Sequence, residues 1–305
     1  MTSHAIVFHV YGDPDVLQLH TFPVPEPSAN QVLVRIRAAG VQPFDVQFRK
    51  GLMAERYPAS FPQKIGNEFA GTVEKIGDEV TRFKSGDAVL GWVVLAAYAE
   101  HVLVSEATLT HKPPQMPWEE AGALTASGQT ALTALDALQV GPEDVLLVHA
   151  AAGGVGSFAV QLAKARGARV IGTASPGNHA YLQSLGTEPV SHGEGLAERV
   201  LELAPQGVTA SLVAVGNEEA LRVSLKVTKN PESIRTLAFH PLARQLGIAW
   251  VGSERSLERL EQLVQFYEKG QLKVHIQEAF PLKDAAKAHR VMEKGHVRGK
   301  LVLLP

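Results

Sequence analysis

The sequence predicts an α/β protein in two parts: a mostly β first third and a doubly wound parallel sheet. Three observations carry this prediction. Short strand-like segments and turn residues follow one another closely in the first third. Strand and helix patterns then alternate, which is typical of parallel sheets. Between the first strand and helix of that alternation lies a turn of small residues at 151–156.

The first third shows the alternating pattern of half-buried strands most clearly at 32–38. Val32, Val34, Ile36 and Ala38 point to one side of such a strand, and the arginines between them point to the other. Turns containing Gly-Asp and prolines separate the segments. We expect strands near residues 4–10, 16–22, 32–38, 68–76, 88–91 and 98–104.

A proline-rich segment at 112–117 predicts a domain boundary, because prolines interrupt regular structure. A helical pattern over 118–138 follows, with an expected break near Gly128. We expect the strands of the parallel sheet near 145–150, 169–174, 209–215, 233–239 and 247–252, and then a helix at 257–267, a strand at 274–279, a helix at 284–294 and a strand at 300–304.

The turn after the apolar run 145–150 matches the phosphate-binding pattern of a dinucleotide site. Ala151, Gly153 and Gly156 occupy the three glycine places of G-x-G-x-x-G, with Gly154 and Val155 inside the turn. Gly153 allows the backbone to approach a pyrophosphate, and Gly156 allows close helix–strand packing. The amides at the helix start then attract the phosphates. The alternative is an ordinary turn of another α/β domain.

The residues after the next strand favour NADPH over NADH. An NAD site places an acidic residue about 20 residues beyond the glycines. No Asp or Glu occurs here between Gly156 and Glu188, so nothing acidic would repel a 2′-phosphate. No Lys or Arg is available either between Arg169 and Arg199. The expected donors are therefore Ser175, Asn178, His179 and backbone amides.

Composition excludes several classes of protein. The net charge is −2, which gives no case for nucleic-acid or membrane-surface binding. The chain has no cysteine, so disulfides, cysteine-ligated zinc and cysteine nucleophiles are excluded. We see no signal peptide and no run long enough to span a membrane, so a cytoplasmic protein is expected.

The segments 39–45, 66–73, 86–89 and 98–102, the turn and the ending 288–303 together resemble the medium-chain dehydrogenases/reductases, in their zinc-free quinone-oxidoreductase-like branch. The likeness covers nearly the whole chain in order. It implies a GroES-like β domain (1–117 and 260–305) with a Rossmann NADP-binding domain (118–259) inserted, and a nicotinamide in the cleft between them.

The resemblance also shows what this chain lacks. Zinc-dependent members place Cys, His and Cys where this chain has Gln42, Asn67 and a residue near Ala126. No histidine pair has a credible third ligand, so no metal site is expected. Without a Lewis acid, alcohol oxidation is disfavoured. Hydride transfer to an acceptor that is already electron-poor stays feasible.

On the substrate side, the resemblance points to Gln42 and Asn67, with Lys64 and Tyr57 flanking them. Gln42 would bond the nicotinamide ribose or the substrate carbonyl, or else only its own loop. Asn67 would face the cleft or hold the loop. Lys64 and Tyr57 could donate to a developing enolate or quinol oxygen, although most surface Lys and Tyr residues have no such role. Asp45 is expected to cap the adjacent short helix.

Further cofactor contacts come from the family pattern. Thr130 would lie near the nicotinamide phosphate or cap a helix, and Phe44 would wall the cleft or pack in the core. Other expected contacts are at strand ends or near the pyrophosphate: Val215, Gly216, Leu237, Ala238 and Lys300.

The function expected is zinc-independent hydride transfer from NADPH to a quinone or an α,β-unsaturated carbonyl compound. Two alternatives stay open: an NADPH-binding protein without turnover, such as a sensor or structural protein, and a biosynthetic enzyme performing a non-redox step. The family also implies a homodimer through a sheet edge supplied by 233–252.

Overall fold

The computed structural model describes all 305 residues and divides them into two compact units. The first unit contains Met1–Ala126, Ser256–Gln265 and Val274–Pro305, and the second contains Ser127–Arg255 and Phe266–Lys273. The first boundary therefore lies beyond the prolines at 112–117. The segment that follows those prolines packs on strands of the first unit, so its contacts keep it there.

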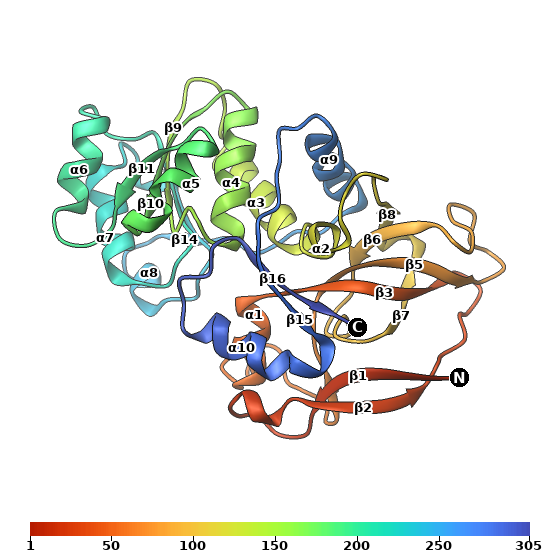
Figure 1. Cartoon of the computed structure of the whole chain (residues 1–305). Coiled ribbons are helices and arrows are strands. Elements are labelled where there is room, and N and C mark those ends of the chain that lie inside the picture. The colour runs from red at the N-terminus through yellow and green to blue at the C-terminus, as the bar shows by residue number, and fades with distance from the viewer. The chain divides into compact units, whose positions relative to one another are not determined.

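Two sheets build the first unit (Figure 1). A three-stranded sheet has the order β2-β1-β4. A seven-stranded sheet has the order β15-β16-β3-β5-β6-β8, with β7 also paired to β3. The strands are β1 (Thr2–Phe8), β2 (Gln18–Pro23), β3 (Gln31–Val41), β4 (Gln63–Lys64), β5 (Glu68–Ile76), β6 (Ala88–Trp92), β7 (His101–Ser105), β8 (Leu109–His111), β15 (Ile276–Pro281) and β16 (Lys300–Leu304).

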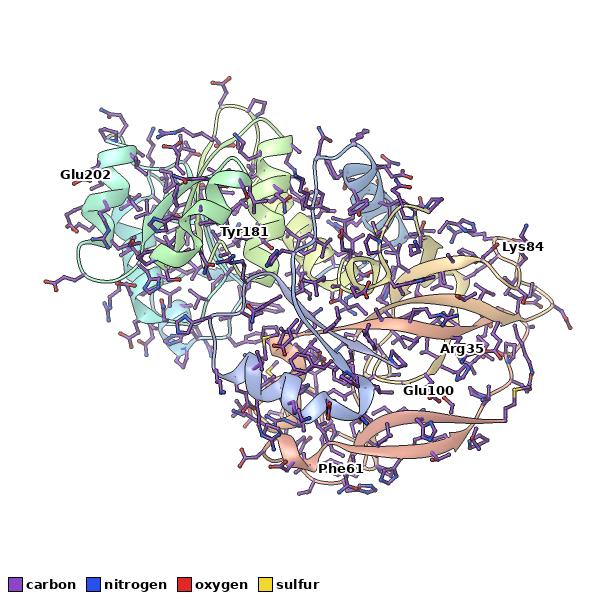
Figure 2. The ribbon with its side chains drawn as sticks, viewed as in Figure 1. Arg35, Phe61, Lys84, Glu100, Tyr181 and Glu202 are labelled. Atoms are coloured by element: carbon purple, nitrogen blue, oxygen red, sulfur yellow. The ribbon has the colours of Figure 1, made fainter.

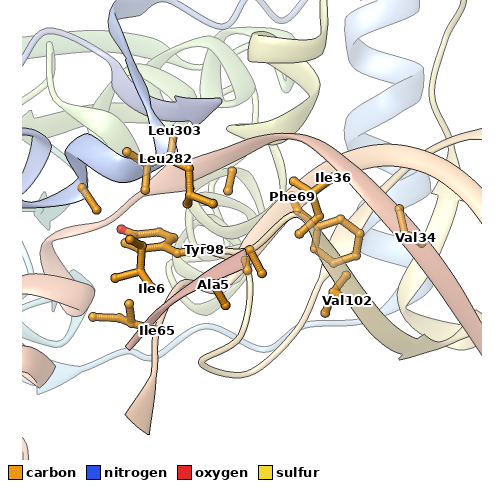
Figure 3. Packing of buried hydrophobic residues seen from close by; sticks show 14 of the residues in the cluster. Ala5, Ile6, Val34, Ile36, Ile65, Phe69, Tyr98, Val102, Leu282 and Leu303 are labelled. Carbon is orange, nitrogen blue, oxygen red and sulfur yellow. The ribbon is translucent and has the colours of Figure 1, made fainter. Parts of the chain in front are cut away.

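The alternation predicted for β3 is confirmed in its burial. Val32, Val34, Ile36 and Ala38 are buried, whereas Arg35, labelled in Figure 2, is exposed. The buried side chains join a core drawn from both sheets. Figure 3 shows the ring of Tyr98 in this core near residues of distant segments, including Ile6, Ile65 and Leu303.

Four helices belong wholly or mostly to the first unit. They are α1 (Pro43–Arg49), α2 (Trp118–Gly122), α10 (Ala285–Glu293) and most of α9 (Leu257–Glu268). α2 and α10 pack on strands of the seven-stranded sheet. α2 packs closely on β3, because a Cβ on Gly122 would lie 2.6 Å from the Ala38 carbonyl oxygen. Only glycine fits at position 122, and its lack of a side chain allows α2 to approach β3 this closely.

The second unit is a six-stranded parallel sheet in the order β11-β10-β9-β12-β13-β14. Numbered along the chain, this is the doubly wound order 3-2-1-4-5-6. Its strands are β9 (Val145–His149), β10 (Arg169–Ala174), β11 (Glu188–Ser191), β12 (Ala210–Val213), β13 (Ile234–Thr236) and β14 (Ala249–Trp250). Near-continuous burial along β9, β10 and β12 is typical of strands covered on both faces.

Six helices belong mainly to this unit: α3 (Thr125–Ala137), α4 (Gly154–Ala165), α5 (His179–Ser184), α6 (Leu196–Leu203), α7 (Glu218–Val227) and α8 (Pro241–Gln245). α4 packs on β9 and β10, and α5 packs on β11. Apolar residues of α6 and the end of α7 join those of β9, β10 and β11 in one buried cluster. The Rossmann-type architecture predicted from the alternation is confirmed.

Several predicted boundaries are wrong in detail. Gly128 does not break the helix: it lies inside α3, and the break falls at Ala123–Leu124. The strands predicted at 209–215, 233–239 and 247–252 are shorter in the structure, where they are β12, β13 and β14. β4, β8 and β11 were not expected, since each is too short for an alternation of apolar and polar residues to be recognised.

No helix is both long and apolar enough to cross a membrane.

Candidate functional site

The turn between β9 and α4 lies at the centre of the parallel sheet. Ala150 opens it with a φ of 53°, in the left-handed region. The Ala151 amide donates to the Thr173 carbonyl of β10 at 3.0 Å, and the Gly153 amide donates to the Ala150 carbonyl at 3.0 Å. Gly153 then caps α4, whose first turn contains no acidic residue. The turn is therefore tied to β10 as well as to β9, from which it continues.

Gly172 and Gly156 allow the turn to form with Ala151 at the first of the three glycine positions of the motif. The Ala151 methyl is fully buried and lies where Gly172 of β10 has no side chain, because a Cβ on Gly172 would be 2.7 Å from that methyl. A Cβ on Gly156 would lie 2.2 Å from the Ala150 carbonyl oxygen. Gly156 is therefore required for close packing of α4 on the turn, as the motif predicts.

The turn has the features that a pyrophosphate needs. The amides at the start of α4 have no partner within their own helix, and the helix dipole places partial positive charge there. At Gly153 the nearest neighbour of an added Cβ would be the Ala150 carbonyl oxygen at 3.3 Å, so this backbone stays open to close approach. The residues present fit a dinucleotide.

The segment after β10 carries the polar residues predicted for the 2′-phosphate. The Asn178 amide nitrogen lies 3.3 Å from Ser175 Oγ. His179 Nε2 lies 3.3 Å from Ser191 Oγ, which links this segment to the end of β11. Arg199 donates to the backbone carbonyls of Ser191, Gly193 and Glu194.

The first acidic residue beyond the turn, Glu188, lies at the opposite end of the strands. It begins β11 and pairs with Arg169, which begins β10, at 2.7 Å. Its carboxylate therefore belongs to the amino edge of the sheet. Ser175 follows the carboxyl end of β10.

The remaining predicted cofactor residues of this unit divide between strand ends and a helix. Val215 and Gly216 follow β12, and Leu237 and Ala238 follow β13. The Leu237 amide donates to the Val213 carbonyl at 3.0 Å, which holds the two strand ends together. Thr130 lies within α3, so the alternative that it caps a helix is wrong.

A buried polar cluster in the first unit joins three residues of the family motifs. Asp45 Oδ2 accepts from the Gln42 amide at 2.9 Å, and Asp45 Oδ1 accepts from the Asn67 side-chain nitrogen at 2.7 Å. Tyr98 also donates to Asp45 Oδ2, at 2.9 Å. The N-cap of α1 is Gln42 and not Asp45. Asp45 lies at N3 and contributes to the cap by accepting from the Gln42 amide, and it also orients Asn67.

Burial shifts the pKa values in this cluster. Desolvation raises the pKa of Asp45 to about 6, against the hydrogen bonds from Tyr98, Gln42 and Asn67 that lower it. Desolvation and the Asp45 charge raise the pKa of Tyr98. His289 Nε2 lies 3.4 Å from the Tyr98 hydroxyl, and burial lowers the pKa of that histidine to about 3. Tyr98 and His289 are therefore neutral.

A second group of charges surrounds the fully buried Glu68. One carboxylate oxygen accepts from Lys300 Nζ at 2.8 Å and from the side-chain nitrogen of Gln42. The other accepts from the Ala126 amide at 2.6 Å. Lys300 is buried, and its ammonium therefore neutralises a carboxylate of its own unit. Gln42 bonds to Glu68 as well as to its own loop.

Phe44, Tyr57 and Lys64 lie near these residues in sequence but make different contacts. Phe44 stacks on Phe48 with ring centroids 6.0 Å apart, and Tyr57 meets Phe44 edge-on at 5.8 Å. Lys64 Nζ lies 4.6 Å from the centroid of the Phe22 ring. The structure joins Gln42 and Asn67 through Asp45, whereas the Lys64 ammonium lies over the β2 residue Phe22.

No group of three or more His, Cys, Asp or Glu residues is arranged to hold a metal ion. At the family's ligand positions this chain has Gln42, Asn67 and Ala126, and all three contribute to the hydrogen bonds around Asp45 and Glu68.

Sequence reasoning missed several residues of both sites. Lys300 is among the expected residues, but Glu68 and its pairing with Lys300 were missed. Each of the two begins an apolar strand, and a lone charge at such a place is a signal for a buried pair. Thr173 and His149 shape the turn from within β10 and β9, where a polar residue in an apolar strand is the corresponding signal. Tyr98 and His289 gave no local signal.

The fold and the turn define a dinucleotide-dependent dehydrogenase or reductase built from a GroES-like unit and a Rossmann unit. The alcohol dehydrogenase GroES-like domain family matches residues 28–115, and the zinc-binding dehydrogenase family matches residues 174–303. The chain belongs to the medium-chain dehydrogenase/reductase superfamily, in its zinc-free quinone-oxidoreductase-like branch.

Three relatives illustrate the similarity. A quinone oxidoreductase of Pseudomonas aeruginosa is 34% identical over 98% of this chain and 99% of its own. The structure of the quinone oxidoreductase from Coxiella burnetii has a TM-score of 0.88 at 33% identity, covering 100% of both chains. The Escherichia coli quinone oxidoreductase complexed with NADPH has a TM-score of 0.88 at 29% identity, again covering 100% of both.

Proposed function

We propose that this protein is an NADPH-dependent oxidoreductase that reduces quinones. The observation that carries the proposal is the turn Ala151–Gly156 at the centre of a 3-2-1-4-5-6 parallel sheet. Full-length similarity to quinone oxidoreductases, one of them complexed with NADPH, supports the same activity. A protein that binds the cofactor without turnover, or performs a non-redox step, is not favoured by these relatives.

The second unit supplies the residues for NADPH. The amides of Gly154, Val155 and Gly156 would hold the pyrophosphate, with Ala151 shaping the turn and Gly153 leaving room for its approach. Val215, Gly216, Leu237 and Ala238 would contact the nucleotide at the strand ends. Thr130 is proposed as a further contact. NADPH, when bound, supplies a hydride to an electron-poor acceptor.

Preference for NADPH over NADH is proposed to come from Ser175, Asn178 and His179. These residues follow the carboxyl end of β10, and Glu188 lies at the other end of the strands. A 2′-phosphate would thus meet hydroxyl, amide and imidazole groups and no carboxylate.

On the substrate side we propose Gln42 and Asn67 as the polar contacts and Phe44 with Tyr57 as an aromatic wall. Asp45 and Glu68 hold the two amides by hydrogen bonds, which would fix their orientation toward a carbonyl oxygen. Lys64 and Tyr57 are kept as candidate donors to the reduced oxygen, and Lys300 as a candidate near the pyrophosphate. α,β-Unsaturated carbonyl compounds are proposed as further acceptors.

The activity is tested by following NADPH oxidation at its nicotinamide absorbance with 1,4-benzoquinone, a larger ortho-quinone and a simple enone. We expect turnover with at least one quinone, and a lower KM for NADPH than for NADH. NADPH binding without oxidation of any acceptor would instead support a sensor or structural protein.

We also propose a cytoplasmic homodimer joined through the edge of the parallel sheet formed by 233–252. β14 ends the strand order on this side, and its residues Ala249 and Trp250 are exposed. The rings of Phe239 and Trp250 stack with centroids 4.4 Å apart beside it. An apolar edge of this kind favours pairing with a second sheet.

A further inference from the structure

The cofactor turn depends on a residue in an unfavourable backbone conformation. Ala150 has a φ of 53°, in the left-handed region that L-residues other than glycine rarely adopt because of steric strain. This conformation turns the chain from β9 toward α4 and places the Ala150 carbonyl within 3.0 Å of the Gly153 amide. Interactions elsewhere must therefore hold Ala150 in place.

Thr173 of β10 makes those interactions. Its carbonyl accepts from the Ala151 amide at 3.0 Å, and its hydroxyl oxygen accepts from the Ala150 amide at 3.2 Å. The side chain is buried, so water does not replace these bonds. A hydroxyl that accepts from a backbone amide has its own proton free to donate elsewhere.

The hydroxyl of Thr173 in turn lies near a ring nitrogen of His149. Thr173 Oγ1 lies 3.4 Å from His149 Nδ1, and His149 Nε2 lies 3.1 Å from Ser224 Oγ on α7. Burial lowers the pKa of His149 to about 3, so its ring is neutral and has one donor and one acceptor nitrogen. If Nδ1 accepts from Thr173, Nε2 must donate to Ser224.

We infer that Thr173, oriented by His149 and Ser224, is the positioning residue that sets the turn for the cofactor pyrophosphate. The hydrogen bonds then run in one direction, from the Ala150 amide to Thr173, to His149 and to Ser224. A charged imidazole would have two donor nitrogens and would break this order. The inference rests on the proposed use of NADPH and names side chains that would not touch the cofactor.

The test compares Thr173→Val, which keeps the shape and removes the hydroxyl, with Thr173→Ser, which keeps the hydroxyl. Kd for NADPH is measured by nicotinamide fluorescence. We expect Thr173→Val to raise this Kd about five- to tenfold, as loss of one net hydrogen bond implies. Thr173→Ser should stay within about twofold of wild type.

Two competing fragments separate an effect on the turn from general damage. 2′-Phospho-ADP-ribose contains the pyrophosphate, and adenosine 2′-monophosphate lacks it. Thr173→Val should weaken the first about as much as NADPH and leave the second within about twofold. Equal weakening of both, or a Kd for NADPH within about twofold of wild type, would overturn the inference.

Ser224→Ala is a second variant in case Thr173→Val folds poorly. It removes the last hydroxyl of the hydrogen-bond series, on α7. We expect a smaller loss of affinity, about two- to fivefold, for NADPH and for the other ligand that contains the pyrophosphate. An unchanged affinity would contradict the role assigned to His149 and Ser224 in orienting Thr173. If wild-type protein binds no NADPH at all, the proposed function fails instead.

Discussion

The buried carboxyl of Asp45 predicts a specific pH dependence of stability. Its pKa is raised by burial to about 6, whereas an unfolded Asp titrates near 4. Between those values the folded state holds the proton more tightly than the unfolded state. The contribution of Asp45 to stability therefore falls as pH rises from about 4 to about 6, and is constant above that range.

Asp45→Asn removes this titration. We expect the stability of wild type relative to the variant to decrease by about 2 kcal/mol between about pH 4.5 and pH 7.5. Urea unfolding of both proteins at several pH values measures the difference. If the two stability curves run parallel over this range, the burial of Asp45 does not have the effect described.

The Glu68–Lys300 pair predicts strong coupling between two mutations. Both side chains are buried, so either single change leaves an uncompensated charge. We expect Glu68→Gln and Lys300→Met each to cost about 3 kcal/mol or more, and the double variant to cost clearly less than their sum. Additive costs in chemical denaturation would show that the two charges do not depend on each other.

The role of a single residue was predictable where a sequence motif specifies it, and less so where it depends on a contact with a residue distant in sequence. Gly156 follows from its spacing to Ala151, and the structure shows why it must be glycine. The pairing of Glu68 with Lys300 joins residues 232 positions apart. Nothing local in either strand determines that pairing, so the sequence alone could not show it.

At the level of elements, the junction of β9, the turn and α4 predicts unequal effects of two glycine substitutions. A Cβ at Gly156 would meet the Ala150 carbonyl oxygen at 2.2 Å, whereas at Gly141 the nearest atom would be 4.0 Å away. We expect Gly156→Ala to raise Kd for NADPH more than tenfold and to lower Tm.

Gly141→Ala is the matched control, and it should leave both quantities close to wild type. NADPH titration and thermal unfolding of the two variants provide the comparison. Equal behaviour of the two variants would mean that α4 can shift away from the turn without consequence.

Helices and strands were predicted well where a periodic pattern extends over many residues, and poorly where tertiary packing determines where they begin and end. The helix pattern over 118–138 is real, but it is divided into α2 and α3 at Ala123–Leu124, next to the glycine at which α2 approaches β3 most closely. Gly128, which local propensity marks as a breaker, is accommodated inside α3 because tertiary packing overrides propensity.

For the molecule as a whole, the edge strand β14 predicts the assembly. We expect a dimer in sedimentation analysis, and Trp250→Lys should shift it to monomer, since a charge on an edge strand opposes pairing. Leu19→Lys is the control, because Leu19 is an exposed apolar residue on β2, an edge strand of the three-stranded sheet. A dimer that survives Trp250→Lys would require another interface.

The architecture of the whole chain was the most predictable feature. Alternating strands and helices determine the parallel sheet, and the order 3-2-1-4-5-6 follows from right-handed connections on either side of β9. Unit boundaries were harder to predict, because they depend on which sheet a short segment such as 118–126 contacts.

A crystal structure of the protein soaked with NADPH tests the central claim most directly. We predict the pyrophosphate within hydrogen-bond distance of the amides of Gly154, Val155 and Gly156, with Ala150 still in its left-handed conformation. A pyrophosphate bound elsewhere, or a turn closed to the nucleotide, would contradict it.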